Sequence, residues 1–539
     1  MMKIRILLAS LLLTASGLGF AHGNLADVVA SGSRAHALTM ISEGTDVNAQ
    51  QADGTTALLY AIHQGDEELV AALIEAGADV NHSNLYGASA LFEAAVLGSS
   101  SIIEMLLDKG ADANWRNPEG ETALMVVARS GNIPAAKVLL AHGADINARE
   151  HWGAQSAIMW AAAQSQPEML RFLIDQGADI NAHGLARLWN RRITSEPRPK
   201  DMNKGGFSPL LYAARQGCTE CVKILAAAGA DLNATDPDRV SALNLALINL
   251  HFDTAATLIE AGADVNQWDL FGRAPLYNAI DLHTLPIGGR PDIPSDDALT
   301  GLDIAKMLLL HGANPNMQLK LRPPYRNAVF DRGADNILST GATPLMRAAR
   351  AADNESVKLL LAHGALVDLP NARGQTPLMV VAGIDYPSAP TRGRYKTEED
   401  SIETIRLLLA AGANINALTG DPALRIFPDA AASDRGAGMQ PAIRGAAVTD
   451  GQTALHGAAK QGWTDIAKYL IDHGARQQVV DAAGRTPFDL AMGRYPPAFL
   501  EAPAEPLVET AMLLQNECLN DDNCTMSETI DFSNPSAIK

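Results

Sequence analysis

Aromatic residues are scarce in this chain of 539 residues: Phe, Trp and Tyr together make up 5% of it, while hydrophobic residues as a whole make up 47%. The core must therefore be built mainly from small aliphatic side chains such as Ala and Leu. Long apolar runs are also missing beyond the first 20 residues, where no uninterrupted stretch reaches the roughly 18 residues of a membrane-spanning helix. We therefore expect no membrane span in the mature chain.

Positive charge is in deficit. The 42 Lys and Arg residues stand against 61 Asp and Glu residues, which gives a formal net charge of −19. Nucleic acids and anionic membrane surfaces are polyanions, so this balance disfavours both as partners. The simplest interpretation is a solvated acidic surface that favours solubility.

Cysteine is rare, with four residues in two close pairs: Cys218 with Cys221, and Cys518 with Cys524. A redox centre at Cys218 and Cys221 would need an activating helix N-terminus in a thioredoxin-like unit, which we do not expect here. A haem site would need His where Val222 stands, and a zinc site would need further ligands nearby. We therefore expect local disulfides or passive thiols, with a thiol redox protein as the remote alternative.

The first 21 residues are typical of a secretion signal. Lys3 and Arg5 supply positive charge, and an uncharged apolar stretch runs from Ile6 to Phe20. Gly19 and Ala21 are small residues at the two positions that matter for cleavage, which suits a cut after Ala21. The alternative is a membrane anchor, but about 15 apolar residues fall short of the roughly 20 that span a bilayer. We expect an exported protein, periplasmic or secreted after cleavage near Ala21.

Two short phrases recur along the chain. The closing phrase, Gly-Ala-Asp-hydrophobic-Asn, begins at Gly77, Gly110, Gly143, Gly177, Gly229 and Gly262, with weaker copies at Gly44, Gly312, Gly364, Gly412 and Gly474. The opening phrase, Gly-x-Thr-Pro/Ala-Leu, begins at Gly54, Gly120, Gly341, Gly374, Gly451 and Gly484, with looser copies at Gly87, Gly153, Gly206, Arg239 and Gly272. The basic period is 33 residues, as from Gly77 to Gly110.

Each phrase predicts a piece of local structure. Thr followed by Pro, as at Thr343, supplies a helix N-cap and a suitable first helical residue. Apolar residues at helical spacing, as from Val357 to Leu361, predict a second helix. Gly364 is placed to end that helix, and the Asp and Asn residues of the closing phrases favour a tight turn.

A 33-residue period with this order of helix, turn, helix and finger resembles the ankyrin repeat. The resemblance covers about residues 24–500 and implies an all-α fold, an ankyrin-repeat α-solenoid with short β-hairpin or turn fingers. We expect the following organisation: a signal peptide at 1–21, an N-terminal capping half-repeat at 22–50, ten ankyrin repeats at 51–483, a C-terminal capping repeat at 484–515 and a flexible acidic tail at 516–539.

Five insertions interrupt the repeats, near 184–204, 283–300, 317–340, 384–400 and 417–450. Three of them interrupt fingers, and two lie between the helices of one unit. They are either tolerated surface loops or binding loops, and two of the finger insertions are basic and aromatic. Arg, Trp and Tyr are enriched in binding hot spots, so the candidate partner-binding residues are Arg187, Trp189, Arg191 and Arg192 in the first insertion, and Arg322, Tyr325, Arg326 and Phe330 in the third.

Motifs of catalysis and metal binding are not found: there is no nucleophile elbow, phosphate loop, dinucleotide fingerprint or paired-His site. Four histidines precede closing glycines at expected helix C-termini, where a cation is favourable: His142, His311, His363 and His473. His456 follows Leu455 in a slot where ankyrin units commonly place His for a turn hydrogen bond. We expect no enzyme, no cofactor and no metal.

The resemblance implies function through protein–protein contact, at the concave finger surface and the first helices. The chain also resembles exported bacterial ankyrin proteins with interrupted repeats. We therefore expect a monomeric scaffold that binds a periplasmic or extracellular protein. The alternative is a secreted effector directed at a host.

Overall fold

The computed structural model describes residues 24–187, 204–284, 297–321, 340–384, 397–420, 450–494, 505–526 and 528–534. The expected signal peptide lies outside these ranges, as does most of each expected insertion. The chain divides into two compact units, Met1–Trp152 and Gly153–Lys539. The described residues of both are helical apart from turns, loops and isolated bridges such as that between Gln50 and Thr56.

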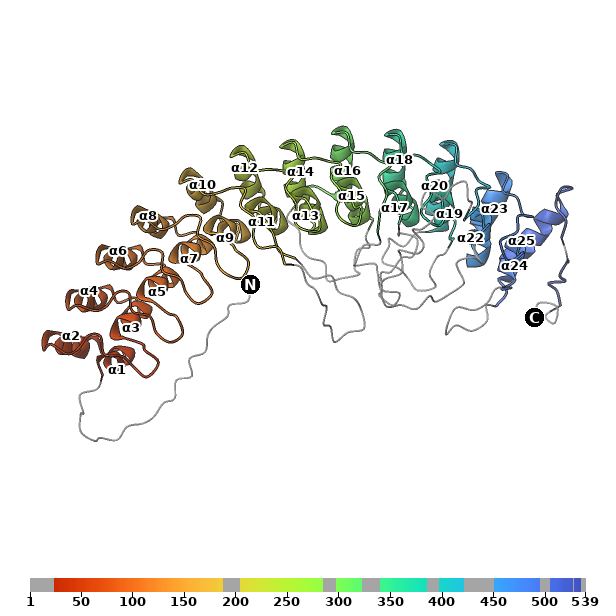
Figure 1. The fold of residues 1–539 in the computed structure, drawn as a ribbon. Coiled ribbons are helices and arrows are strands. Elements are labelled where there is room, and N and C mark those ends of the chain that lie inside the picture. The colour runs from red at the N-terminus through yellow and green to blue at the C-terminus, as the bar shows by residue number, and fades with distance from the viewer. Residues whose placement is uncertain are drawn as a thin grey trace. The chain divides into compact units, whose positions relative to one another are not determined.

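The first unit is a stack of helix pairs (Figure 1). The pairs are α1 (Leu25–Ala30) with α2 (Arg34–Ser42), α3 (Ala57–His63) with α4 (Glu67–Glu75), α5 (Ala90–Leu97) with α6 (Ser100–Asp108), and α7 (Ala123–Ser130) with α8 (Ile133–Ala141). First helices pack on first helices, from α1 through α3 and α5 to α7, and second helices pack on second helices from α2 to α8. The N-terminal cap expected as a half-repeat therefore holds a complete helix pair.

The second unit repeats this arrangement. Its pairs are α9 (Ala157–Ala163) with α10 (Pro167–Asp175), α11 (Pro209–Gln216) with α12 (Thr219–Ala227), α13 (Ala242–Ile248) with α14 (Phe252–Glu260), α15 (Pro275–His283) with α16 (Gly301–Leu310), α17 (Pro344–Ala351) with α18 (Asn354–Ala362), α19 (Pro377–Val381) with α20 (Glu398–Ala410), α22 (Ala454–Gln461) with α23 (Thr464–Asp472), and α24 (Pro487–Ala491) with α25 (Val508–Leu519). The predicted helical-repeat solenoid is confirmed.

Helix starts and ends follow the two phrases. Thr343 accepts a hydrogen bond from the backbone N–H of Met346 at 3.1 Å, and Pro344 is the first residue of α17. The N-cap satisfies a backbone donor that the first turn leaves open. Gly77, just after α4, has a φ of +92°, in the left-handed region that ends helices.

An asparagine in each of several closing phrases ties one repeat to the next. The side chain of Asn81 donates to the carbonyl of Gly110 at 2.9 Å and accepts from the backbone N–H of Asp112 at 2.8 Å. We call the recurring two-way contact the asparagine ladder; it recurs at Asn48, Asn114, Asn266, Asn316 and Asn416. The Asn of the closing phrase thus joins repeats as well as shaping its own turn.

The C-terminal region differs from the flexible tail expected at 516–539. Helix α25 continues to Leu519, and Cys518 is bonded to Cys524. The side-chain amide of Gln515 donates to the carbonyl of Ile530 at 2.9 Å and accepts from its N–H at 2.7 Å. Over 516–526 and 528–534 the chain is therefore held against its last helix.

The structure describes residues that flank the insertions. At the first finger insertion, the N–H of Arg187 donates to the carbonyl of Lys204 at 2.7 Å, and the N–H of Gly206 donates to that of Leu185 at 3.1 Å. A sixth interruption was not predicted: Ala491 ends α24, and Val508 begins α25. No closing phrase follows Gly484, so no spacing between phrases could reveal it.

Candidate interaction surfaces

Of the predicted partner-binding residues, the structure describes only Arg187, which is half-buried at the edge of the first finger insertion. The remaining ones lie outside the described residues: Trp189, Arg191, Arg192, Arg322, Tyr325, Arg326 and Phe330.

Four successive fingers of the second unit are joined edge to edge around this position. Lys204 of the first forms an ion pair with Asp238 of the next. The N–H of Leu270 in the third finger donates to the carbonyl of Asp238 at 2.9 Å. In the fourth, the N–H of Lys320 donates to the carbonyl of Phe271 at 2.8 Å. These contacts fix neighbouring fingers as one surface.

A tryptophan with two cations lies on this surface. The guanidinium carbon of Arg239 is 4.1 Å from the centre of the Trp268 ring, and the ammonium nitrogen of Lys320 is 3.3 Å from it. Both cations belong to exposed residues, and Trp268 is half-buried. We call Arg187, Lys204, Arg239, Trp268 and Lys320 the basic finger edge. Sequence reasoning missed it because these residues come from separate fingers.

Arg239 has an unusual backbone. Its φ is +62°, whereas the corresponding residue is a glycine with positive φ in nine other fingers: Gly54, Gly87, Gly120, Gly206, Gly272, Gly341, Gly374, Gly451 and Gly484. A left-handed conformation costs a residue with a side chain about 1–2 kcal/mol. An exposed cation–π contact returns only about 0.5–1 kcal/mol. The contact with Trp268 therefore does not by itself offset the strain at Arg239.

The carboxylates beside this edge are already engaged. Asp236 accepts the backbone N–H groups of Asp238 and Val240 at 2.9 and 2.8 Å, and its burial raises its pKa. Asp269 is fully buried and 2.6 Å from the Nε of Arg273. Within the described ranges, neither Arg239 nor Lys320 forms an ion pair with a carboxylate.

Three large apolar side chains are exposed on the same fingers. Leu185 is 46% exposed, Leu270 43% and Leu321 38%. The basic finger edge therefore offers positive charge and apolar contact area together.

A different surface stands out in the first unit. Leu85 and Tyr86 at a finger tip are 80% and 77% exposed, and Val96 and Leu97 at the end of α5 are 56% and 44% exposed. We call these four residues the apolar repeat surface. The corresponding residues of the flanking repeats are mostly polar: Ala52, Asp53, His63 and Gln64 on one side, and Pro118, Glu119, Arg129 and Ser130 on the other.

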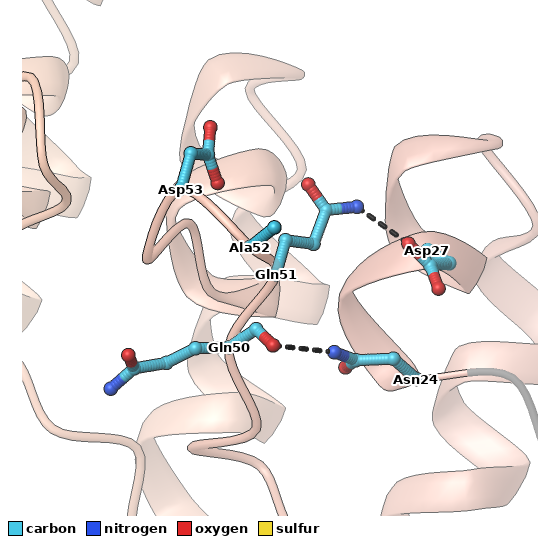
Figure 2. Close-up of a pocket in the computed structure, with 6 residues that line it drawn as sticks. All are labelled: Asn24, Asp27, Gln50, Gln51, Ala52 and Asp53. Carbon is cyan, nitrogen blue, oxygen red and sulfur yellow. Dashed lines mark hydrogen bonds between the residues drawn. The ribbon is translucent and has the colours of Figure 1, made fainter.

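A small hollow lies near the start of α1, lined by Asn24, Asp27, Gln50, Gln51, Ala52 and Asp53 (Figure 2). Its amides are satisfied locally: Asn24 donates to the carbonyl of Gln50 at 2.9 Å, and Gln51 donates to the carboxylate of Asp27 at 2.6 Å. It contains no aromatic or cationic side chain, so it is the weakest candidate for a binding site.

The two cysteines of Cys218-x-x-Cys221 are bonded to each other. Contrary to the expectation from sequence, a helix N-terminus is present: Cys218 is the N-cap of α12, and its sulfur accepts the N–H of Cys221 at 3.2 Å. Cys218 is only 9% exposed and Cys221 is fully buried, which restricts access of a thiol partner. Among the described residues, no group of three or more His, Cys, Asp or Glu side chains is placed to hold a metal ion.

The histidines occupy the positions expected of them. The Nδ1 of His142 lies 2.9 Å from the carbonyl of Val138, and this hydrogen bond, together with Asp108, raises the pKa of His142. The same backbone contact is made by His311, His363 and His473. His456 is fully buried; its Nδ1 accepts the N–H of Thr453 at 3.1 Å, and burial lowers its pKa to about 4.

Stacked helix pairs that present fingers for contact define a helical-repeat scaffold, a class that typically binds proteins and does no catalysis. The family model for ankyrin repeats (3 copies) matches residues 25–117, 109–183, 190–282, 298–389 and 430–498. These matches cover more than half of the chain, which therefore belongs to the ankyrin-repeat family. No helix in the described ranges has the length and apolar character needed to cross a bilayer.

Curated relatives share the repeats over part of their length. Human ankyrin repeat and SOCS box protein 16 is 29% identical over 53% of this chain and 47% of its own. The putative ankyrin repeat protein YahD of Escherichia coli is 28% identical over 38% of this chain and 95% of its own. The solved ankyrin repeat domain of human ASB11 is 24% identical, with a TM-score of 0.37, over 44% of this chain and 96% of its own. The chain thus spans about half of the first of these relatives.

Proposed function

We propose that this chain is an exported, non-enzymatic scaffold that binds a periplasmic or extracellular protein through its fingers and first helices. The observation that carries the proposal is the apolar repeat surface. Its four large apolar side chains are 44–80% exposed within a single repeat. Large apolar side chains left exposed on a finger tip and on the end of the following helix offer contact area to a partner, and aromatic residues such as Tyr86 are enriched in hot spots.

The binding experiment compares the mature chain with a variant carrying Leu85→Ser and Tyr86→Ser. Partners recovered from the native compartment are purified and tested directly against both proteins. We expect the double variant to bind at least tenfold more weakly. The matched control is Leu310→Ser, which removes a side chain that is 78% exposed at the end of α16. Equal binding by all three proteins would remove the apolar repeat surface from the proposal.

The basic and aromatic finger insertions belong to the same proposal as additional contacts. The test is a chain in which the first and third insertions are each replaced by a short Gly-Ser link. Recovery of the same partners with the same affinity would show that these insertions are tolerated loops.

Two observations support export. Residues 1–21 have the charge and apolar pattern of a secretion signal. Both cysteine pairs are bonded, and disulfides persist mainly in oxidising compartments. The test is fractionation of expressing cells, with N-terminal sequencing of the recovered protein. Recovery from the cytoplasm with residues 1–21 intact would contradict export.

A further inference from the structure

We propose that the basic finger edge recognises an acidic segment of a partner protein, in which Asp or Glu residues alternate with large apolar ones. This inference rests on the proposed function and names the chemistry of the partner at a second surface, which differs from the apolar repeat surface of the first unit. It uses only residues of the second unit.

Charge is the first step of the argument. The chain as a whole carries a net charge of −19, yet the exposed residues Arg239 and Lys320 each place a cation over the Trp268 ring. The neighbouring carboxylates are occupied by backbone N–H groups at Asp236 and by Arg273 at Asp269. Two cations without a described carboxylate partner on an acidic protein attract an incoming carboxylate, because complementary charges favour association.

The backbone of Arg239 is the second step. Glycine occupies this place in nine other fingers and meets its left-handed φ without strain. The contact of Arg239 with Trp268 returns less than the strain costs, and the other non-glycine at this place, Ala154 with a φ of +50°, brings no charge to its finger. Residues held in strained conformations cluster at binding sites. The Trp268 ring also holds both cations in place, which reduces the ordering that binding would otherwise require.

Exposed leucines favour an acidic peptide over a nucleic acid as the ligand of this surface. Leu185, Leu270 and Leu321 are exposed on the same four fingers as the cations. A peptide that carries both acidic and apolar side chains can use both kinds of contact. The phosphate backbone of a nucleic acid uses only the charge, and the acidity of the whole chain opposes its approach. The surface therefore favours an acidic and apolar protein segment over a nucleic acid.

The experiment is a selection of random 12-residue peptides on the full chain, followed by affinity measurements on the selected peptides. We expect enrichment of Asp and Glu together with Leu, Ile or Phe. Arg239→Gly and Lys320→Gln should each weaken binding about tenfold. Raising the salt concentration should weaken binding of the unmodified chain more than that of a variant carrying both Arg239→Gly and Lys320→Gln. Lys223→Gln is the matched control, because Lys223 is exposed on the second helix α12 of the same unit.

Arg239→Gly tests binding without a loss of stability, because glycine adopts the left-handed φ of this position without strain. It should fold with unchanged or raised thermal stability, so loss of binding cannot be ascribed to unfolding. A single-stranded DNA 20-mer serves as the competing probe. Tighter binding of this DNA than of the best peptide, with loss in Arg239→Gly, would overturn the proposal in favour of a nucleic acid.

Other outcomes separate this inference from the proposed function. Selected peptides that lack acidic residues, bind Arg239→Gly normally and are lost with Tyr86→Ser would overturn the acidic assignment and leave the scaffold function standing. If neither the selection nor the native compartment yields a ligand for either surface, both proposals fail.

Discussion

Asp368 is the residue at which the asparagine ladder changes chemistry. Its Oδ2 accepts the N–H of Asn414 at 2.9 Å, as the side-chain oxygen of Asn316 does with the N–H of Leu366. The amide of Asn316 also donates to the carbonyl of Gly364 at 3.0 Å. A carboxylate has no such donor, and the Oδ1 of Asp368 is buried without a hydrogen-bond partner. Burial accordingly raises the pKa of Asp368.

We predict that Asp368→Asn stabilises the protein by about 1 kcal/mol at pH 7, since the amide supplies the missing hydrogen bond. The folded pKa of Asp368 is raised, so the native state binds this proton more tightly. The penalty is thus fully present above the folded pKa and is relieved as the pH falls through it. Urea unfolding at several pH values measures both effects. The reverse change, Asn316→Asp, should destabilise by a similar amount. Destabilisation by Asp368→Asn, or stabilisation by Asn316→Asp, would refute the ladder interpretation.

His456 gives a pH dependence of opposite sign. Its folded pKa is lowered to about 4 from an ordinary value of 6.5, because the imidazole is buried. Above pH 6.5 the residue is neutral in both states and its stabilising contribution is complete. Between pH 6.5 and 4 the unfolded chain takes up a proton that the folded site excludes, so the C-terminal repeats should lose roughly 3 kcal/mol of stability. Hydrogen exchange of α22 and α23 across this range measures the loss.

The control for this prediction comes from the repeat itself. Met379 fills the equivalent position after the N-cap of α19, and its sulfur lies 3.5 Å from the N–H of Thr376. His456→Met should therefore keep the packing and remove most of the pH dependence between 6.5 and 4. If His456→Met keeps the same slope, another group carries the effect.

At the scale of an element, α25 shows how the last helix is covered. A terminal repeat must present a finished face to water. Here the chain after α25 turns back, with the amide of Gln515 bonded in both directions to the backbone of Ile530. The disulfide between Cys518 and Cys524 closes a loop at the end of α25, just before the chain turns back.

We predict that Gln515→Ala speeds amide exchange at residues 528–534, because it removes two hydrogen bonds worth together about 1–3 kcal/mol. Helix α23 should keep its protection. Met512→Ala is the control on the same helix, because the Met512 side chain is 40% exposed. Unchanged exchange at Ile530 in the Gln515 variant would show that other contacts hold the return segment.

For the whole molecule, the local stability of each repeat should depend mainly on its packing against adjacent repeats. Helix α18 packs against α17 and α20 in the second unit, and Leu360 in its last turn is fully buried. We predict that Leu360→Ala costs about 2–5 kcal/mol and raises exchange first in α17, α18 and α20, since each repeat is held mainly by its neighbours. Leu366→Ala, at a residue 56% exposed, should have little effect. A uniform rise in exchange as far as α10 would contradict this picture.

The fold could be predicted from the sequence because the residues of each phrase determine local backbone structure. The Thr343-Pro344 pair and the closing glycines set helix starts and ends without help from distant residues. The hydrogen bonds that join Gln515 to Ile530 could not be predicted, because they link a helix to an irregular segment. The basic finger edge was missed for a related reason: Arg239, Trp268 and Lys320 meet only once their fingers are stacked.

The left-handed arginine has a consequence for sequence families. Glycine at position 239 would be the easier residue for the fold, and the proposed contact with an acidic partner gives a reason for arginine there. In an alignment of close homologues, we therefore expect Arg239 and Trp268 to covary: where the arginine has reverted to glycine, the tryptophan should have drifted as well. We expect Arg239 to be retained in homologues that keep the acidic partner. In homologues that have lost this partner, a single codon change is enough to restore glycine.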